Sequence, residues 1–328
     1  MLGLFLLPKL EICGKIHRLI KSMGKEGQPQ QKEWDIEVEL PQLVEIILEE
    51  IRPTQELVEK TNQGEKLGET DFKDFKKFSH ELISAAIKTR QKLGFPPPNK
   101  DHIVMFLYEL AYTAKLYNGQ LRKNGDKAFD SHVIGVLRNL IQEDNVTGLT
   151  TLLTGMKHDV TEDILGTGEE EKLFCTHLYI KQLKELPSAA IQQITDNVRK
   201  KVEAVTKVTG LGNKEAERAE TFIRLLEATM EDIRVAMVKV GGDRRHNMST
   251  ITGHDEEGQI RIAEETATIY LRLAQVMKIY ITENGLLKDC LRVLNPEFLK
   301  EFEEAIESEM EKDKDLGSDI QRLLTKNK

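Results

Sequence analysis

The 328-residue chain has few cysteines, few prolines and no surplus of basic residues. Its three cysteines, Cys13, Cys175 and Cys290, are odd in number and widely separated, which excludes a disulfide framework and a CxxC metal pair. This usage fits a reducing compartment, and we expect a cytoplasmic protein. The formal net charge of -8 argues against a general nucleic-acid binder, because sequence-independent affinity for phosphate backbones needs an excess of Lys and Arg. A small anionic ligand in a locally basic pocket is still compatible with this charge.

Long apolar runs are also missing. The N-terminal stretch MLGLFLLPKL is apolar, but it lacks a basic n-region and stops at Pro8-Lys9. It is too short for a signal h-region or a membrane span, and no later run is apolar enough to cross a bilayer. We therefore expect no export and no membrane insertion, and a buried or partner-facing role for this stretch.

Helical periodicity is the main pattern that is present. Charged residues make up 31% of the chain, and Leu, Ile, Glu, Lys and Ala recur at spacings of three and four, which predicts an all-α protein with few or no strands. The stretch GFPPPNKD (94–101) interrupts this pattern because three consecutive prolines cannot continue a helix. We therefore predict an N-terminal helical accessory region at 1–99, a main domain at 100–285 and a charged helical cap at 286–328.

Two of the predicted helices matter for the chemistry. One covers GLTTLLTGMKHDVTED (148–163), and a single long helix covers EAERAETFIRLLEATMEDIRVAMVKV (215–240). On the first helix, residues four apart share a face, so Glu162 lies one turn beyond His158 and Asp163 one turn beyond Asp159. This face could offer an imidazole and a carboxylate to a metal, with two further carboxylates beside them. The alternative is that solvated acids simply end an apolar helix.

Further candidate ligands lie elsewhere in the chain. His132 opens the apolar helix SHVIGVLRNLI, and Asp243 follows the end of the long helix. Together with His158 and Asp159 they would give two imidazoles and two carboxylates, a mixed set suited to Mn²⁺, Fe²⁺ or Zn²⁺. Basic residues that could hold an anionic substrate lie near these ligands; the alternative is that they are solvated helix ends. These residues are Arg122, Lys123, Arg244 and Arg245.

The order of the motifs resembles a known family. Along the chain come G-Q-x-R-K-x-G (119–125), His132, H-D-x-x-E-D (158–163), V-x-x-V-T-K (202–207), D-R-x-H-N-M (243–248) and IAEETATIY (262–270). This series closely resembles the hydrolase domain of the RelA/SpoT family, the HD-type phosphohydrolases that remove the 3′-pyrophosphate from ppGpp and pppGpp. The resemblance covers about residues 101–280.

The resemblance implies a fold, a reaction and a set of roles. It implies an all-α HD-domain helical bundle, with the N-terminal helices as an addition, that hydrolyses guanosine alarmones to GDP or GTP and pyrophosphate. A single Mn²⁺ would be held by His132, His158, Asp159 and Asp243, and the catalytic acidic pair would be Glu162 and Asp163. The nucleotide would be contacted by Arg122, which packs against the guanine base, by its neighbour Lys123, and by Asn247 and Thr250. Bifunctional members continue into a synthetase domain, and we expect only the hydrolase part here.

Several positions depart from the family pattern. Tyr117 replaces a His, Lys157 replaces an apolar residue before His158, and Gly242 replaces an Ala before Asp243. The segment 166–188 is longer than the family leads us to expect. The other departures are Asn124, Val133 and Arg272.

The departures spare every inferred ligand and both acids, so we expect the chemistry to be retained, but they touch the nucleotide pocket and its walls. Two alternatives stay open: an HD phosphohydrolase for another nucleotide, and a non-catalytic nucleotide-binding regulatory module. The expected ligand in each case is a small nucleotide and not a nucleic acid or a membrane. The N-terminal helices could bind a protein partner or mediate self-association.

Overall fold

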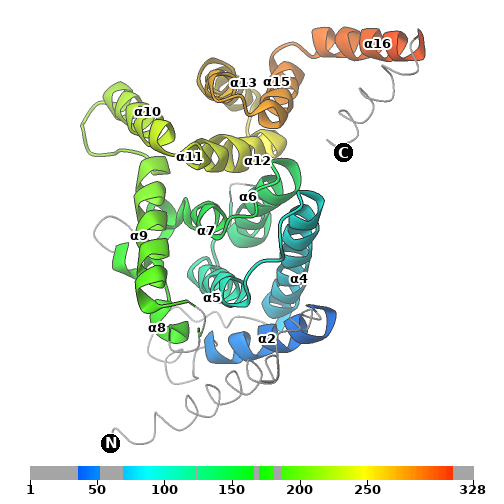
Figure 1. Cartoon of the computed structure of the whole chain (residues 1–328). Helices are drawn as coiled ribbons and strands as arrows, with labels where there is room; N and C mark the ends of the chain where they lie inside the picture. Colours follow the sequence, from blue (N-terminus) through cyan, green and yellow to red (C-terminus); the bar gives the residue numbers. More distant parts are fainter. Residues whose placement is uncertain are drawn as a thin grey trace, which may run out of the picture. The chain divides into compact units, whose positions relative to one another are not determined.

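A computed structural model describes residues 36–51, 69–122, 124–165, 170–180, 183 and 186–312 of the chain. Within these ranges the regular structure is helical and contains no strand, and the one extended pairing among them is the isolated bridge between Leu121 and Lys127 (Figure 1). The predicted all-α fold class is confirmed. A search of the same residues finds no helix with the length and apolarity that crossing a membrane requires.

The chain folds as two compact units, each made of two stretches of sequence. Unit 1 draws on Met1–Gln120 and Thr147–Val202, and unit 2 draws on Leu121–Val146 and Glu203–Lys328. The proline-rich stretch lies between two helices that both belong to unit 1. The division at 99 and 285 that we predict from composition stays a prediction.

Unit 1 is organised around one buried helix, α5 (Lys100–Leu116). Asn99 caps its start by accepting a hydrogen bond from the Asp101 backbone N–H, which ends the proline stretch and begins the helix. Apolar residues surround its axis, as expected of a helix covered by neighbours. The helix packs against α2, α4, α7 and α8. The elements of unit 1 are α2 (Ile36–Ile51), α4 (Glu69–Lys92), α5, α7 (Leu149–Lys157), the π-helix η3 (Thr161–Leu165), the 3₁₀-helix η4 (Glu170–Leu173), α8 (Thr176–Tyr179) and most of α9 (Ser188–Val205).

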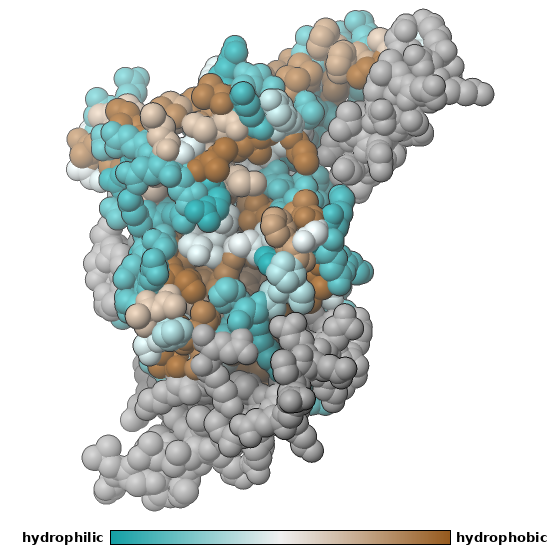
Figure 2. Space-filling model, in the orientation of Figure 1, coloured by the Kyte–Doolittle hydropathy of each residue, from teal (hydrophilic) through white to brown (hydrophobic). Residues whose placement is uncertain are grey.

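The helix α9 shows how the sequence pattern becomes packing. Ile191, Thr195, Val198 and Val202 recur at spacings of three and four and are all buried. Most of the polar residues between them are exposed, and Figure 2 shows mostly hydrophilic residues over this side of α9. Burying the apolar stripe is the main gain that holds such a helix in place.

Unit 2 begins with a helical run interrupted by π-helical turns and continues with a longer set of helices. Its core is apolar and includes Val235, Val240, Met248, Leu273 and Leu286. The elements of unit 2 are η1 (Phe129–Val133, π), α6 (Ile134–Arg138), η2 (Asn139–Glu143, π), α10 (Lys214–Glu231), α11 (Arg234–Ala236), η5 (Met237–Arg244, π), α12 (Arg245–Ser249), η6 (Ile251–Gly253, 3₁₀), α13 (Glu256–Glu265), η7 (Thr266–Tyr270, π), α14 (Leu271–Val276), α15 (Tyr280–Leu294) and α16 (Pro296–Lys312).

Two helix boundaries differ from the sequence prediction. The single helix predicted at 215–240 is two, because α10 ends at Glu231 and Asp232 takes an extended backbone. Asp232 Oδ1 then accepts the backbone N–H of Arg234, the first residue of α11, at 3.0 Å. The helix predicted through 163 also stops early, since α7 ends at Lys157 and a turn and the π-helix η3 follow.

Candidate functional site

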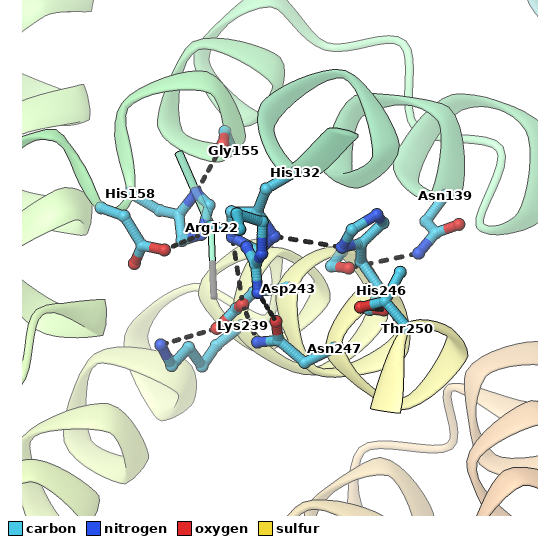
Figure 3. Close-up of polar contacts among 12 residues, drawn as sticks. Arg122, His132, Asn139, Gly155, His158, Lys239, Asp243, His246, Asn247 and Thr250 are labelled. Carbon is cyan, nitrogen blue, oxygen red and sulfur yellow. Dashed lines mark hydrogen bonds and ion pairs between the residues drawn. The ribbon is translucent and has the colours of Figure 1, made fainter. Parts of the chain in front are cut away.

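The His158–Asp159 pair lies at the C-terminal end of α7 in unit 1. The His158 ring is buried, and its Nδ1 is 2.8 Å from the carbonyl oxygen of Gly155 (Figure 3). A carbonyl oxygen can only accept, so Nδ1 carries the proton and donates it. The other ring nitrogen, Nε2, lies 3.0 Å from Asp159 Oδ2. Unit 1 thus holds an imidazole nitrogen and a carboxylate oxygen side by side.

A buried ion pair supports this end of α7. Lys157 precedes His158, and its Nζ lies 2.8 Å from Glu109 Oε2 on α5, with both side chains fully buried. The other carboxylate oxygen of Glu109 accepts hydrogen bonds from Tyr179 Oη at 2.8 Å and from the Cys175 backbone N–H at 3.1 Å. Buried charges are costly unless they are paired and hydrogen-bonded, and this pair meets both conditions.

Two departures from the family pattern are therefore parts of one network. Lys157 replaces an apolar residue, and the partners of its counter-ion Glu109 come from the unexpectedly long segment 166–188. Burial, helped by the Glu109 charge, raises the pKa of the Cys175 thiol well above its ordinary value. The same two causes raise the pKa of Tyr179. Both groups therefore stay neutral near Glu109, and Cys175 has no thiolate character for catalysis.

The predicted acidic pair follows in η3. Glu162 is half-buried and Asp163 is exposed, and the backbone N–H of Asp163 donates to the carbonyl of Asp159 at 2.8 Å. The acids therefore stay close in sequence and backbone to the His158–Asp159 pair, although the intervening backbone is a turn and not a continuous α-helix. π-helical turns are rare and occur often at functional sites.

Unit 2 holds the second His–Asp pair. His132 lies in η1 and Asp243 in η5, and both side chains are about 95% buried. His132 Nε2 lies 3.6 Å from Asp243 Oδ1. Asp243 does not follow the end of a helix, as the sequence suggested, because the helical backbone continues from η5 into α12.

Two side chains fix the Asp243 carboxylate. Asn247 Nδ2 donates to Oδ1 at 2.6 Å, and the buried Lys239 Nζ lies 2.7 Å from Oδ2 (Figure 3). The sequence analysis missed Lys239. Its signal was a lysine inside the apolar run VAMVKVGG, four residues before Asp243, where a buried charge needs a partner on the same helical face.

The sequence analysis also missed His246, which contacts His132. The two Nδ1 atoms are 3.1 Å apart, and the rings meet edge to face at 67°. His246 is buried against Gly135 of α6, where an added Cβ would come within 2.1 Å of the His246 ring. No local pattern could have shown this contact, because the two histidines are 114 residues apart in sequence.

Close helix packing explains another departure from the family pattern. A Cβ on Gly242 would lie 2.9 Å from a methyl carbon of Val136 on α6. Asn139 also donates to the carbonyl of Gly242 at 3.3 Å. Glycine at this position therefore lets η5 approach α6 and η2 closely, next to Asp243.

The predicted nucleotide contacts are also in unit 2. Arg122 lies in a tight turn closed by the bond from its N–H to Asp126 O, with Gly125 at φ 87°. Arg122 Nη2 donates to Asn247 Oδ1 at 3.0 Å, so the structure links two predicted substrate residues to each other and, through Asn247, to Asp243. Lys123 lies outside the described residues.

The other two predicted substrate residues are engaged elsewhere in unit 2. Thr250 Oγ1 donates to the His246 carbonyl at 3.0 Å, which ends α12. The Arg244 guanidinium carbon lies 3.9 Å from the centre of the Tyr270 ring, and its Nη1 is 3.4 Å from Glu265 Oε2. Thr250 and Arg244 thus have protein partners of their own, and their substrate roles stay predictions.

The chain is similar in sequence to known proteins. The HD domain family matches residues 110–279, which is more than half of the chain. A protein of Myxococcus xanthus named GTP pyrophosphokinase is 34% identical over 206 residues, covering 62% of this chain and 24% of its own length. A GTP pyrophosphokinase rsh of Brucella ovis is 31% identical over 222 residues, covering 66% of this chain and 26% of that protein.

A third relative carries the name of a hydrolase. The guanosine-3′,5′-bis(diphosphate) 3′-pyrophosphohydrolase of Aquifex aeolicus is 28% identical over 208 residues, covering 61% of this chain and 26% of its own length. The chain spans about a quarter of the length of these curated relatives. From its helical fold, its matched residues and these relatives, the chain belongs to the HD domain family and carries an HD domain of the RelA/SpoT type.

Proposed function

We propose that the chain is a metal-dependent hydrolase that removes the 3′-pyrophosphate of guanosine alarmones and yields GDP or GTP and pyrophosphate. Membership of the HD domain family and the printed name of the Aquifex aeolicus relative support a nucleotide phosphohydrolase. Retention of Glu162 and Asp163 favours an enzyme over a binding module, because a protein that only binds nucleotide has no need of an acidic pair.

The metal would be held jointly by the two His–Asp pairs. His132, His158, Asp159 and Asp243 each offer one ligand atom, and two imidazole nitrogens with two carboxylate oxygens suit Mn²⁺, with Fe²⁺ and Zn²⁺ as alternatives. In each pair the imidazole Nδ1 has a hydrogen-bond partner while Nε2 faces a carboxylate oxygen. At His158, whose Nδ1 carries the proton, the lone pairs of Nε2 and Asp159 Oδ2 repel at 3.0 Å in the neutral ring, and a cation between the two atoms removes the repulsion. This arrangement is the observation that carries the proposal.

The protein groups around the metal would divide the remaining tasks. A divalent metal in this set would supply Lewis acidity, which activates water and offsets phosphoryl charge. Glu162 would accept the proton of the attacking water, because it is half-buried and close to the ligands in sequence. Asp163 is the candidate for handling the proton of the leaving group.

Basic and amide groups would hold the nucleotide. Arg122 would pack against the guanine base, and its bond to Asn247 keeps it on the Asp243 side of unit 2. Lys123 and Arg244 would offset the charge of the pyrophosphate, and Thr250 would add a polar contact. A nucleotide bound in this way would have its 3′-pyrophosphate near the four proposed metal ligands, and all four would remain available to the metal.

A hydrolysis screen tests the proposal. Purified protein with Mn²⁺ is incubated with ppGpp, pppGpp, NADPH, deoxynucleoside triphosphates and cyclic nucleotides, and pyrophosphate and nucleotide products are measured. Release of pyrophosphate with GDP or GTP from the alarmones, abolished by a chelator, is the expected result. Turnover of another nucleotide alone would move the assignment to a different HD phosphohydrolase, and binding without turnover would make the chain a regulatory module.

A matched pair of substitutions gives the control. Asp243→Asn should abolish turnover, because it removes a ligand charge. Asp255→Asn changes an exposed cap of α13, where Asn caps as well as Asp, and should leave turnover intact. Cytoplasmic location and a partner-binding role of the N-terminal helices stay predictions.

A further inference from the structure

We propose that His246 is a positioning residue that holds the His132 ring in the tautomer able to bind a metal, and that Gly135 is a glycine because the His246 ring needs its space. This inference rests on the proposed function, since it assumes that His132 is a metal ligand. It concerns contacts within unit 2 only.

The tautomer argument follows from one distance. The Nδ1 atoms of His132 and His246 are 3.1 Å apart, so one of them donates and the other accepts. If the lone pair of His132 Nε2 binds a metal, the proton of the neutral ring is on Nδ1, and His132 is the donor. His246 must then accept at Nδ1 and carry its own proton on Nε2. Without an acceptor at this point, His132 would favour a proton on Nε2, where Asp243 Oδ1 lies 3.6 Å away.

The surroundings of His246 fix its ring in the accepting position. Its carbonyl receives the Thr250 backbone N–H at 3.1 Å and the Ser249 hydroxyl at 2.8 Å, which anchors the backbone at the end of α12. The ring fills the space over Gly135, and a methyl group there would come within 2.1 Å of it. Because a distance of 2.1 Å is far inside van der Waals contact and the interior is close-packed, an alanine at 135 must displace the His246 ring.

The histidine of unit 1 provides the contrast. His158 donates its Nδ1 proton to the backbone carbonyl of Gly155, a partner that substitution cannot remove. The orientation of His132 depends on a side chain instead. A change at His246 should therefore affect His132 alone and leave the His158 hydrogen bond as an internal reference.

The experiment compares His246→Leu with His246→Asn, whose amide oxygen can accept near the position of Nδ1. His254→Leu is the matched control, since His254 lies outside this cluster. Mn²⁺ affinity is measured by titration calorimetry, thermal unfolding is measured without metal, and slowly exchanging imidazole N–H protons are observed by NMR in the Zn²⁺-loaded protein. Wild type should show the Nδ1 protons of His132 and His158, in addition to the Nε2 proton of His246 itself. His246→Leu should lose the His132 signal and weaken Mn²⁺ binding roughly ten- to a hundredfold, the usual effect of removing such an outer partner.

The variants separate the outcomes. His246→Asn and His254→Leu should bind Mn²⁺ with an affinity within a few fold of wild type. Gly135→Ala should weaken Mn²⁺ binding as His246→Leu does, so it tests the same role if His246→Leu does not fold. If His246→Leu and Gly135→Ala bind Mn²⁺ like wild type with both N–H signals intact, while His132→Ala loses binding, the positioning role is wrong and the proposed function stands. If His132→Ala itself binds Mn²⁺ like wild type, the proposed function fails first.

Discussion

Units 1 and 2 each hold a histidine beside an aspartate, but they hold them in different ways. In unit 1, His158 is oriented by a backbone carbonyl, and the buried ion pair next to it joins Lys157 to Glu109. In unit 2, His132 and Asp243 are oriented by side chains, and the buried cation Lys239 contacts the aspartate directly. The orientation of His158 therefore depends on the course of the main chain. The orientation of His132 and Asp243 depends on side chains that single substitutions can remove.

The largest expected effect comes from breaking the unit 1 ion pair. Lys157→Met leaves the Glu109 carboxylate buried without its counter-ion, and such a loss costs roughly 4–5 kcal/mol of unfolding free energy. Chemical denaturation measures it. Added Mn²⁺ should not restore the loss, because the pair does not include a proposed ligand. The double variant Lys157→Met/Glu109→Leu should recover most of it, and failure to recover would mean that the network is not held by charge pairing.

A smaller effect, with a different response to metal, is expected in unit 2. Lys239→Met removes the cation from Asp243 Oδ2 and should cost roughly 3–4 kcal/mol without metal, because Asn247 still donates to Oδ1. Here Mn²⁺ should restore stability, since a cation replaces the lost charge. Denaturation with and without Mn²⁺ tests this. If Mn²⁺ restored the stability of Lys157→Met and not that of Lys239→Met, the contrast between the two units would be wrong.

The third prediction concerns pH and unit 2. Burial raises the pKa of Asp144 to about 6, against the hydrogen bond from Thr282 and the charge of Arg245, while the value in the unfolded chain is 3.8. A raised carboxyl pKa stabilises the fold below pH 3.8, and this contribution is lost as pH rises through about 6. Asp144→Asn should therefore gain about 2–3 kcal/mol relative to wild type between pH 4 and pH 7. Denaturation across this pH range measures the difference in unfolding free energy between Asp144→Asn and wild type. A difference that does not change with pH would contradict the raised pKa.

The smallest effect is expected at an exposed ion pair. Lys300 and Glu304 lie one turn apart on α16 with side chains 77% and 65% exposed. Lys300→Met should change the unfolding free energy by less than about 0.5 kcal/mol, because solvent and salt screen such pairs. A loss comparable to that of Lys157→Met would show that burial does not distinguish the two kinds of pair.

Periodicity predicted the all-α fold from sequence, but helix ends were harder. The apolar spacing runs through Asp232 without interruption, so the sequence suggested one helix where Asp232 ends α10 and its side chain accepts the backbone N–H of Arg234 at the start of α11. The same limitation applies after Lys157, where α7 gives way to a turn and η3. Local competition between capping and helix continuation decides such points, and periodicity does not register it.

The candidate ligands could be named from sequence, whereas their supporting residues could not. His132, His158, Asp159 and Asp243 stand out as residue types in apolar surroundings and in motifs. His246 and Gly135 gain their meaning only from a contact across 111 residues, and Lys157 gains its meaning from Glu109, 48 residues earlier. Contacts of that range are set by tertiary packing, so a single sequence does not reveal them.

The central claim is that the two His–Asp pairs hold one divalent metal together. Pulsed electron paramagnetic resonance of the Mn²⁺-loaded protein, combined with metal analysis, tests it directly by counting coordinated imidazole nitrogens per ion. We predict one Mn²⁺ per chain with two nitrogens, of which His132→Ala removes one and His158→Ala the other. Two independently bound ions with one nitrogen each, or an ion that keeps both nitrogens in either variant, would contradict the claim.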